Sequence, residues 1–247
     1  MQLEKEFIDR WNITGYQIEK QFNSKKNKVY LVRADIEGAG QKRFVLKQYK
    51  GRHRSVSREA DILAELYKRG VSVPELYYRG AKSIVIEYVN GPTLIDVMTD
   101  AEYIAGQKFD YINAKGMASH IARWLDGFYK AMEQITGRSI ILWDINLRNF
   151  LVGYKLYGID FEECREGAYE EDLGRLLAFI VTYAPAFTPY KIEFAREVYN
   201  ALGSRLDLDR DRVMAETAKE FDAIRDRRGM EIPEDIVGRI IPVNLFP

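Results

Sequence analysis

The fold is decided by Ile140-Ile-Leu-Trp-Asp-Ile-Asn-Leu-Arg-Asn-Phe-Leu-Val152 and by its continuation, Lys155-Leu-Tyr-Gly-Ile-Asp-Phe161. Apolar runs alternate here with single polar side chains, so Asp144, Asn149 and Asp160 are expected at the ends of buried segments. Carboxylates that lose hydration beside apolar backbone repel one another unless a cation neutralises them. Oxygen ligands of this kind suit a divalent metal, and Mg²⁺ is the natural candidate.

The same stretch predicts a short β-hairpin. Phe150–Val152 and 156–159 are apolar segments on either side of Gly153, where the chain can turn. Such a hairpin returns Asp160 towards Asn149. In the alternative interpretation no site exists, because Asp144 caps one turn and Asp160 starts another.

The composition is that of an ordinary globular protein, with 247 residues of which 47% are hydrophobic and 30% charged. This length suits one large domain or two lobes that share a cleft. The single Cys164 excludes an intramolecular disulfide and fits a reducing compartment. No secretory signal begins the chain, and no apolar run approaches the ~20 residues of a membrane-spanning helix, so a cytoplasmic protein is expected.

The net charge is zero, but the charges are unevenly distributed. The segment from Lys20 to Arg58 holds twelve basic and two acidic residues, an excess of +10. This segment should attract anions. A solvated basic face, nucleotide phosphates and a peripheral anionic surface all remain open as explanations, and no specific nucleic-acid binding is expected.

Before Asn90 the sequence predicts an antiparallel sheet with one helix. Segments 16–18, 28–33 and 43–49 have the β-branched and aromatic content of strands, and the last two are joined by a turn at 37–40. A helix is expected over 55–69, ending before Gly70. Glu59 falls in the apolar stripe of this helix and needs a partner, for which Lys47 at a strand end is the candidate.

After Asn90 the sequence predicts mostly helices. The strand over 83–88 breaks into Val89-Asn-Gly-Pro92, a linker pattern that places a boundary near Asn90. A long apolar stripe predicts a helix from Met117 to Ile135. Further helices are expected after Asp172, which would cap the first of them, and over 192–202 and 213–224.

Together, the Asp-x-x-x-x-Asn spacing, the hairpin and the following Asp resemble the catalytic core of the protein-kinase-like fold. The resemblance covers residues from about 16 to 185. It implies an α+β, two-lobed fold, with an N-terminal antiparallel sheet plus helix over 1–89 and a mostly helical lobe over 90–247.

The resemblance also implies roles for the polar residues. The residue that matches Asp144 accepts the proton of the substrate hydroxyl, and those that match Asn149 and Asp160 hold Mg²⁺ on the phosphates of ATP. The residue that matches Lys47 contacts the α- and β-phosphates and pairs with the one that matches Glu59. The residue that matches Asp172 fixes the backbone of the catalytic loop.

For the adenine of ATP, the resemblance implies a pocket lined by Val45 and bordered by the backbone of Glu87, Tyr88 and Val89. The loop that covers the phosphates in this family is usually rich in glycine, whereas the loop over 21–27 contains none. Asn27-Lys-Val-Tyr30 is similar to a motif of aminoglycoside- and choline-kinase-like enzymes, so Ser24 and Asn27 are expected to substitute, with charge added by Lys25 and Lys26.

The chain resembles the compact branch of this fold. Only eleven residues separate Asp160 from Asp172, too few for the activation segment of regulated protein kinases. The similar groups are aminoglycoside- and choline-type phosphotransferases, lipopolysaccharide-sugar kinases, and Bud32-like or RIO-like atypical kinases. Leu142 stands where a His is common, and Glu162 stands where protein kinases have Gly.

We therefore expect an ATP- and Mg²⁺-dependent transfer of a phosphoryl group to a hydroxyl of a small molecule or sugar. The alternatives are an atypical protein Ser/Thr kinase and a pseudokinase that serves as an interaction module. Five acids follow Asp160, and a solvated face is a better explanation for them than a site for a cationic acceptor. They are Glu162, Glu163, Glu166, Glu170 and Glu171.

Overall fold

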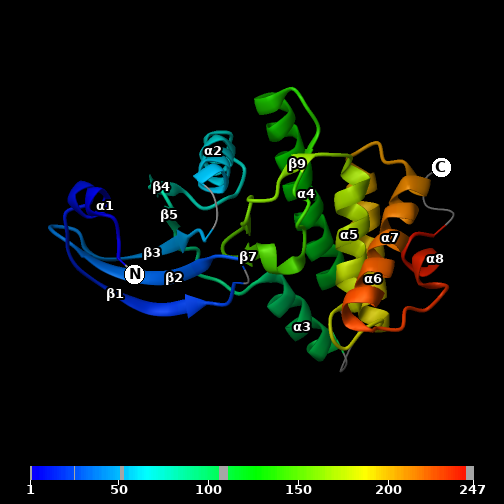
Figure 1. Cartoon of the computed structure of the whole chain (residues 1–247). Helices are drawn as coiled ribbons and strands as arrows, with labels where there is room; N and C mark the ends of the chain where they lie inside the picture. Colours follow the sequence, from blue (N-terminus) through cyan, green and yellow to red (C-terminus); the bar gives the residue numbers. More distant parts are fainter. Residues whose placement is uncertain (1, 25, 51–52, 106–110, 243–247) are drawn as a thin grey trace. The chain divides into compact units, whose positions relative to one another are not determined.

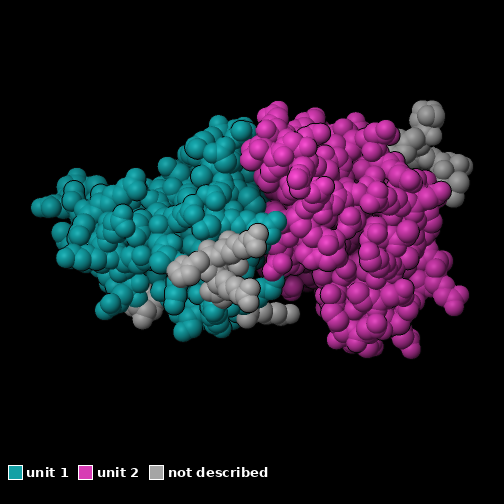
Figure 2. Space-filling model, turned by 45° about the horizontal axis from the view of Figure 1, so that its top comes forward, with its two compact units in different colours: residues 1–90, 159–162 teal, residues 91–158, 163–247 magenta. Residues whose placement is uncertain are grey.

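The computed structural model describes residues 2–24, 26–50, 53–105 and 111–242, and the side chains of 53–55, 104–105 and 111–113 are outside the description. The chain divides into two compact units, which Figure 2 colours separately. Unit 1 consists of residues 1–90 and 159–162, and unit 2 consists of 91–158 and 163–247. The fold is α+β, with the large antiparallel sheet in unit 1 and most of the helices in unit 2 (Figure 1).

Unit 1 is built on a five-stranded antiparallel sheet with strand order β1-β2-β3-β5-β4. The predicted strands are present, the first three longer than expected and β5 one residue shorter, and β4 was not predicted. Its four residues, of which only Tyr78 is buried, give too short a pattern to distinguish from a loop. The strands are β1 (Ile13–Phe22), β2 (Lys28–Ile36), β3 (Gly40–Gln48), β4 (Leu76–Arg79) and β5 (Ser83–Glu87).

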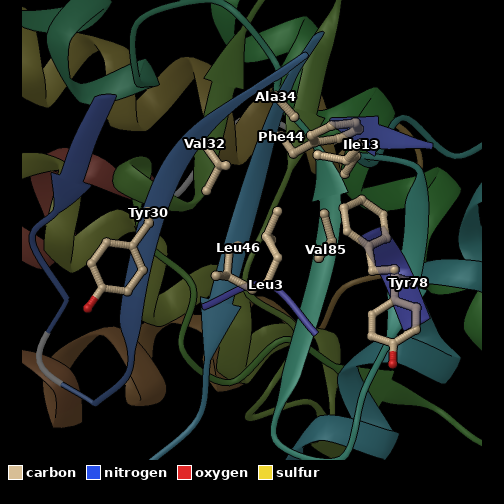
Figure 3. Close-up of a cluster of buried hydrophobic side chains, with 10 residues drawn as sticks. Leu3, Ile13, Tyr30, Val32, Ala34, Phe44, Leu46, Tyr78 and Val85 are labelled. Atoms are coloured by element: carbon tan, nitrogen blue, oxygen red, sulfur yellow. The ribbon is translucent and has the colours of Figure 1, made fainter. Parts of the chain in front are cut away.

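One face of this sheet carries the hydrophobic core of unit 1 (Figure 3). Val32, Phe44 and Leu46 alternate inward along neighbouring strands, as the two-residue period of a strand requires. Helix α1 (Lys5–Arg10) covers this core with Phe7, whose ring lies edge-on to that of Phe44 with centroids 5.4 Å apart. Val45 and Lys47 therefore belong to the opposite face of β3.

Helix α2 (His53–Lys68) packs against β4 and β5. Its apolar stripe of Val56, Leu63 and Leu66 is buried, and Glu59 is buried within the same stripe, as predicted. The helix ends before Gly70, which has a φ of +74° that only glycine adopts without strain. The spacing of the sequence thus places a carboxylate inside the unit.

Unit 2 is mainly helical. The long helix α4 packs on α6, α6 packs on α5, and α5 packs on α7 (Figure 1). The close approach of α5 and α7 depends on Gly174, because a Cβ there would lie 2.7 Å from the backbone nitrogen of Thr217. The helices are α3 (Leu94–Ala105), α4 (Tyr111–Thr136), α5 (Tyr169–Thr182), α6 (Pro189–Gly203), α7 (Arg210–Arg228) and α8 (Ile236–Ile240), and the 3₁₀ helix η1 spans Leu147–Asn149.

The predicted hairpin is present as β7 (Phe150–Val152) and β8 (Leu156–Gly158), with Phe150 opposite Gly158. A Cβ at Gly158 would lie 2.0 Å from the ring of Trp124, so the hairpin packs directly on α4. A second two-stranded sheet pairs β6 (Ile140–Ile141) with β9 (Arg165–Glu166). The two sheets hold both ends of the stretch that contains Asp144.

The helices expected over 117–135, 192–202 and 213–224 are present with longer bounds, whereas α1, α3 and α8 were not predicted. Within the part of the chain that the structure describes, every helix is too short or too polar to cross a membrane. Lys25, expected to add charge to the loop after β1, and Arg52 lie outside the described residues.

Candidate functional site

The predicted ion pair between Lys47 and Glu59 is present in unit 1. The Nζ atom of Lys47 donates to Oε2 of Glu59 and to Oδ1 of Asp160, at 2.7 Å in both cases. The side chains of Lys47 and Glu59 are 8% and 2% exposed, whereas that of Asp160 is 44% exposed. The ammonium group therefore joins a buried carboxylate to one that is open to solvent.

Tyr49 completes this group and was not singled out in the sequence. Its hydroxyl donates to Oε2 of Glu59, and burial followed by the Glu59 carboxylate raises the pKa of Tyr49, so the hydroxyl stays a neutral donor. Burial alone would lower the pKa of Lys47, but the carboxylates of Glu59 and Asp160 more than offset this effect, and the pKa of Lys47 is raised. The lysine is thus a fixed positive charge at neutral pH.

The loop after β1 is tied to the same group. Asn27 is buried, its Nδ2 donates to Oε2 of Glu162 at 2.6 Å, and its backbone N–H donates to the hydroxyl of Ser24 at 3.3 Å. Oε2 of Glu162 also lies 3.8 Å from Nζ of Lys47. Ser24 and Asn27 are therefore joined by a hydrogen bond in a loop without glycine, and Glu162 holds the side chain of Asn27.

Val45, on the same face of β3 as Lys47, is half-buried and lies opposite Ile86. The backbone that is expected to bind adenine begins at Glu87, the last residue of β5, and continues through Tyr88 and Val89. The N–H of Glu87 already donates to the carbonyl of Glu75 at 2.9 Å. Of the Glu87 backbone, therefore, only the carbonyl is a candidate to bind a nucleotide base.

In unit 2, Asp144 is exposed and Asn149 is half-buried. A hydrogen bond from the side chain of Asn149 to the backbone of Asp144 joins the two residues. The Nδ2 of Asn149 donates to the carbonyl of Asp144 at 2.6 Å. This bond orients the amide so that its oxygen, Oδ1, is the atom suited to a metal ligand. The structure thus brings the predicted residues together as two groups, Lys47–Glu59–Asp160 in unit 1 and Asp144–Asn149 in unit 2.

Asp172 fixes the backbone just before Asp144. Its Oδ2 accepts from the N–H of Leu142 at 2.7 Å and from the hydroxyl of Tyr129 at 3.1 Å, and its Oδ1 accepts from the N–H of Trp143 at 2.9 Å. The prediction that Asp172 caps a helix is wrong, because α5 begins at Tyr169 and Asp172 lies inside it. Leu142 replaces the common His without loss of this bond, since only its backbone is used.

Burial, opposed by these hydrogen bonds and by Arg175, raises the pKa of Asp172 to about 6. The carboxylate is fully buried and accepts from three neutral donors. Its charge is therefore stabilised by hydrogen bonds in place of a direct ion pair.

Trp143, the residue before Asp144, has a φ of +65°, a conformation that non-glycine residues adopt only when their surroundings enforce it. The guanidinium carbons of Arg165 and Arg175 lie 3.3 and 3.7 Å from the centroid of its indole, and groups so close to one centroid can only lie on opposite faces. Arg175 also donates to the carbonyl of Trp143 and, through Nε, to Oε2 of Glu220 at 3.0 Å. Arg165 and Arg175 therefore hold the ring of Trp143, Asp172 holds its N–H, and Arg175 holds its carbonyl.

The expected solvated acidic face is present only in part. Glu166 is 63% exposed, whereas Glu162 and Glu171 are each 15% exposed and are bonded within the protein. Glu170 is itself buried, and the hollow beside it is lined by acids that already have partners. No cationic acceptor is therefore needed to explain them. The bonds join Glu162 to Asn27, Glu166 to Arg138, Glu170 to the N–H of Asp209, and Glu171 to Arg165.

Sequence reasoning missed Tyr49, Arg175 and Glu220, and for two of them a signal exists. Tyr49 stands two residues after Lys47, so it shares a face of the extended chain. Arg175 stands three residues after Asp172, so it shares a face of the helix. Glu220 lies on another helix, and no local pattern connects it to Arg175.

In comparisons with known proteins, no protein-family model matches this chain, and no curated protein sequence matches it. The interpretation of the two groups therefore depends on their geometry and chemistry.

Proposed function

We propose that this protein is a phosphotransferase of the protein-kinase-like fold, which moves the γ-phosphoryl group of ATP to a hydroxyl of a small molecule or sugar. The observation that carries the proposal is the position of Lys47, whose buried ammonium bridges Glu59 on a helix and Asp160, 113 residues further along the chain. A solvated strand-end lysine needs no such arrangement. An ammonium that neutralises phosphate needs counter-charges that hold it in place.

The donor set fits Mg²⁺. Carboxylate oxygens of Glu59, Asp160 and Glu162 lie within 4.8 Å of one another in unit 1, and oxygen ligands are those that Mg²⁺ prefers. Glu59 is engaged with Lys47 and Tyr49, so within unit 1 the exposed Asp160 is the better ligand. The family resemblance assigns the second ligand to Oδ1 of Asn149 in unit 2. A metal bound there would supply positive charge to the phosphates.

In the proposed reaction the acceptor hydroxyl oxygen forms a bond to the γ-phosphorus, and the bond between that phosphorus and the β,γ-bridging oxygen breaks. ADP leaves with the electron pair, and the hydroxyl proton passes to the carboxylate of Asp144. Phosphoryl transfer depends on alignment more than on a strong base. The bonds that hold Trp143 and Asn149 around Asp144 supply that alignment.

Asp144→Asn tests the assignment. Turnover should fall by at least about a hundredfold, the typical worth of a positioned proton acceptor, while the affinity for Mg·ATP stays unchanged. The matched control is Asp211→Asn on α7, because the Asp211 side chain is 91% exposed. Equal turnover by Asp144→Asn and the unaltered protein on a true substrate would rule out this role for Asp144.

Thermal unfolding with ATP, with and without Mg²⁺, tests the metal site. A bound nucleotide stabilises the folded state, and Mg²⁺ should increase the effect. Asp160→Asn should remove the increase, whereas Asp61→Asn, on the outer surface of unit 1, should keep it. If Mg·ATP does not stabilise the protein, the interaction module is the better interpretation. If the protein phosphorylates protein chains in preference to small molecules, it is a protein kinase.

A further inference from the structure

Two arginines from distant parts of the chain meet an aromatic pair at the end of α5 in unit 2. The rings of Phe179 and Tyr183 are stacked, with centroids 6.4 Å apart. The guanidinium carbon of Arg148 lies 5.2 Å from the Tyr183 centroid, and that of Arg228 lies 5.7 Å from the Phe179 centroid. Arg148 is four residues from Asp144, on the loop already assigned to the reaction.

Arg228 differs from its neighbours at the end of α7. Arg225 pairs with Asp222 at 2.7 Å, and Arg227 pairs with Glu220 at 2.6 Å. Arg228 forms no ion pair with any described residue and donates only to a backbone carbonyl, that of Thr182 at 3.4 Å.

Arg148 likewise forms no ion pair within the described ranges, and its side chain is exposed. A guanidinium that lies over an aromatic ring keeps its N–H donors in the plane of the group, where they can bind a carboxylate or phosphate through two bonds. Two such groups, neither of them ion-paired with a described residue, therefore lie against the stacked rings of Phe179 and Tyr183, and Arg148 also belongs to the loop of Asp144.

The hydroxyl of Tyr183 adds an unused donor. The residue is 6% exposed, and its O–H donates to no acceptor in the described part of the chain. Burial raises the pKa of Tyr183, the charges of Arg148 and Arg228 and the N–H of Leu147 oppose the increase, and the carboxylate of Asp144 adds to it. Because the pKa of Tyr183 is raised, its hydroxyl stays protonated and keeps a proton to donate.

We propose that Arg148, Arg228 and Tyr183 bind an anionic group, a phosphate or a carboxylate, on the acceptor whose hydroxyl Asp144 receives. This inference rests on the proposed phosphotransfer and narrows its acceptor to anionic hydroxyl compounds. Asp144 repels an anion and attracts a hydroxyl proton, whereas the arginines attract the anion. The two ends of the acceptor are therefore distinguished, and a cationic acceptor is disfavoured.

Turnover of three matched acceptors tests the charge preference. Glycerol, glycerate and glycerol phosphate each offer a hydroxyl and differ in the anionic group. The unaltered protein should use glycerate or glycerol phosphate with a KM at least about tenfold below that for glycerol, as expected for a charge-assisted hydrogen bond, and the better of the two identifies the anion. A preference for glycerol, or for an amino alcohol such as choline, would overturn the proposal.

Substitution of the arginines tests the position. Arg148→Gln and Arg228→Gln should each raise the KM for the anionic acceptor about tenfold and leave the KM for ATP unchanged. Arg225→Gln, which removes a paired arginine from the same helix end, should change neither. Equal KM values in all three variants would contradict the assignment.

Binding of inorganic phosphate separates this inference from the proposed reaction. At constant ionic strength, phosphate should raise the Tm of the unaltered protein above its value in chloride, and Arg148→Gln and Arg228→Gln should lose this increase while Arg225→Gln keeps it. If the increase in Tm depends on the arginines but no acceptor is phosphorylated, the anion site is confirmed and the proposed reaction is wrong. If acceptors are phosphorylated but the increase is the same in all variants, the reaction stands and the anion site fails.

Discussion

The two groups of candidate site residues stabilise buried charge in different ways. In unit 1, the carboxylate of Glu59 is balanced by the opposite charge of Lys47. In unit 2, the carboxylate of Asp172 accepts only from neutral groups, two backbone N–H groups and the hydroxyl of Tyr129. The first arrangement keeps the ammonium of Lys47 charged and fixed in place, and the second holds a backbone in one conformation.

The difference corresponds to the tasks that we propose. A lysine that neutralises phosphate must stay charged and must be presented to the ligand, so it needs counter-charges. The exposed Asp144 must point in one direction, so the peptide groups before it must not move. The first group should therefore be sensitive to removal of a charge, and the second to removal of a hydrogen bond and to pH.

Lys47→Met should have the largest effect on stability. It leaves Glu59 buried with Tyr49 as its only bonded partner among the described residues, and an uncompensated buried charge costs about 3–5 kcal/mol. Urea unfolding of the variant measures the loss. The control is Lys68→Met, since Lys68 is 67% exposed in its pair with Glu65 and should change the free energy of unfolding by less than about 1 kcal/mol.

The double variant Lys47→Met/Glu59→Leu sharpens this result. It removes both charges, so most of the lost stability should return. If the single and double variants are equally unstable, the loss comes from packing around Lys47 and not from the unpaired carboxylate.

Asp172 should make the stability of the protein fall as the pH rises through weakly acidic values. Its pKa is 3.8 in an ordinary environment and about 6 in the folded protein, because of burial. Between these values the folded state keeps a proton that the unfolded state has lost, so a rise in pH favours unfolding, by about 3 kcal/mol over the whole interval. Below about pH 4 the contribution is fully present, and above about pH 6 it is lost.

Asp172→Asn removes this titration and tests it. The free energy of unfolding is measured for both proteins from pH 4 to pH 7, and the advantage of the unaltered protein should shrink by about 3 kcal/mol as the pH rises. Carboxylates elsewhere titrate in both proteins and cancel. Parallel profiles would show that Asp172 is ionised throughout the range.

Two hydroxyl deletions compare the groups directly. Tyr129 and Tyr49 each donate one hydrogen bond to a buried carboxylate, the first to Asp172 and the second to Glu59. Tyr129→Phe should cost about 2 kcal/mol and Tyr49→Phe about 1 kcal/mol, because Glu59 keeps Lys47 as a partner and Asp172 has no ion pair. Equal losses in urea unfolding would mean that the ion pair and the hydrogen bonds stabilise their carboxylates equally well.

The sequence was sufficient for features that follow from local spacing. Glu59 was recognised because a carboxylate in an apolar helical stripe must be buried, and the hairpin was recognised from two apolar segments around Gly153. The sheet and the long helices follow from the same periodicities. All of these depend on residues that are close in the chain.

The features that could not be predicted depend on element boundaries or on distant contacts. Whether Asp172 caps a helix or lies inside it depends on where α5 begins, and helix starts are uncertain by a few residues. The acids after Asp160 resemble a solvated face in sequence because their partners, such as Arg138 and Asn27, lie far away in the chain. Glu220, the partner of Arg175, has no sequence signature for the same reason.

Substitution of the two arginines that enclose Trp143 should have the smallest effects on stability. The two variants separate the role of the Trp143 ring from that of its backbone carbonyl. Arg165 is 43% exposed, lies over the ring of Trp143 and pairs with Glu171 at 2.7 Å, so Arg165→Gln should cost about 0.5–1 kcal/mol and leave kcat within about twofold. Arg175 also holds the carbonyl of Trp143, so Arg175→Gln should lower kcat at least about tenfold through misalignment of Asp144, with the KM for ATP unchanged. Its cost in stability stays near 1 kcal/mol, because Glu220 keeps Arg227 at 2.6 Å. If both variants lower kcat equally, the stacked ring positions Asp144; if only Arg175→Gln does so, the backbone bond is what positions it.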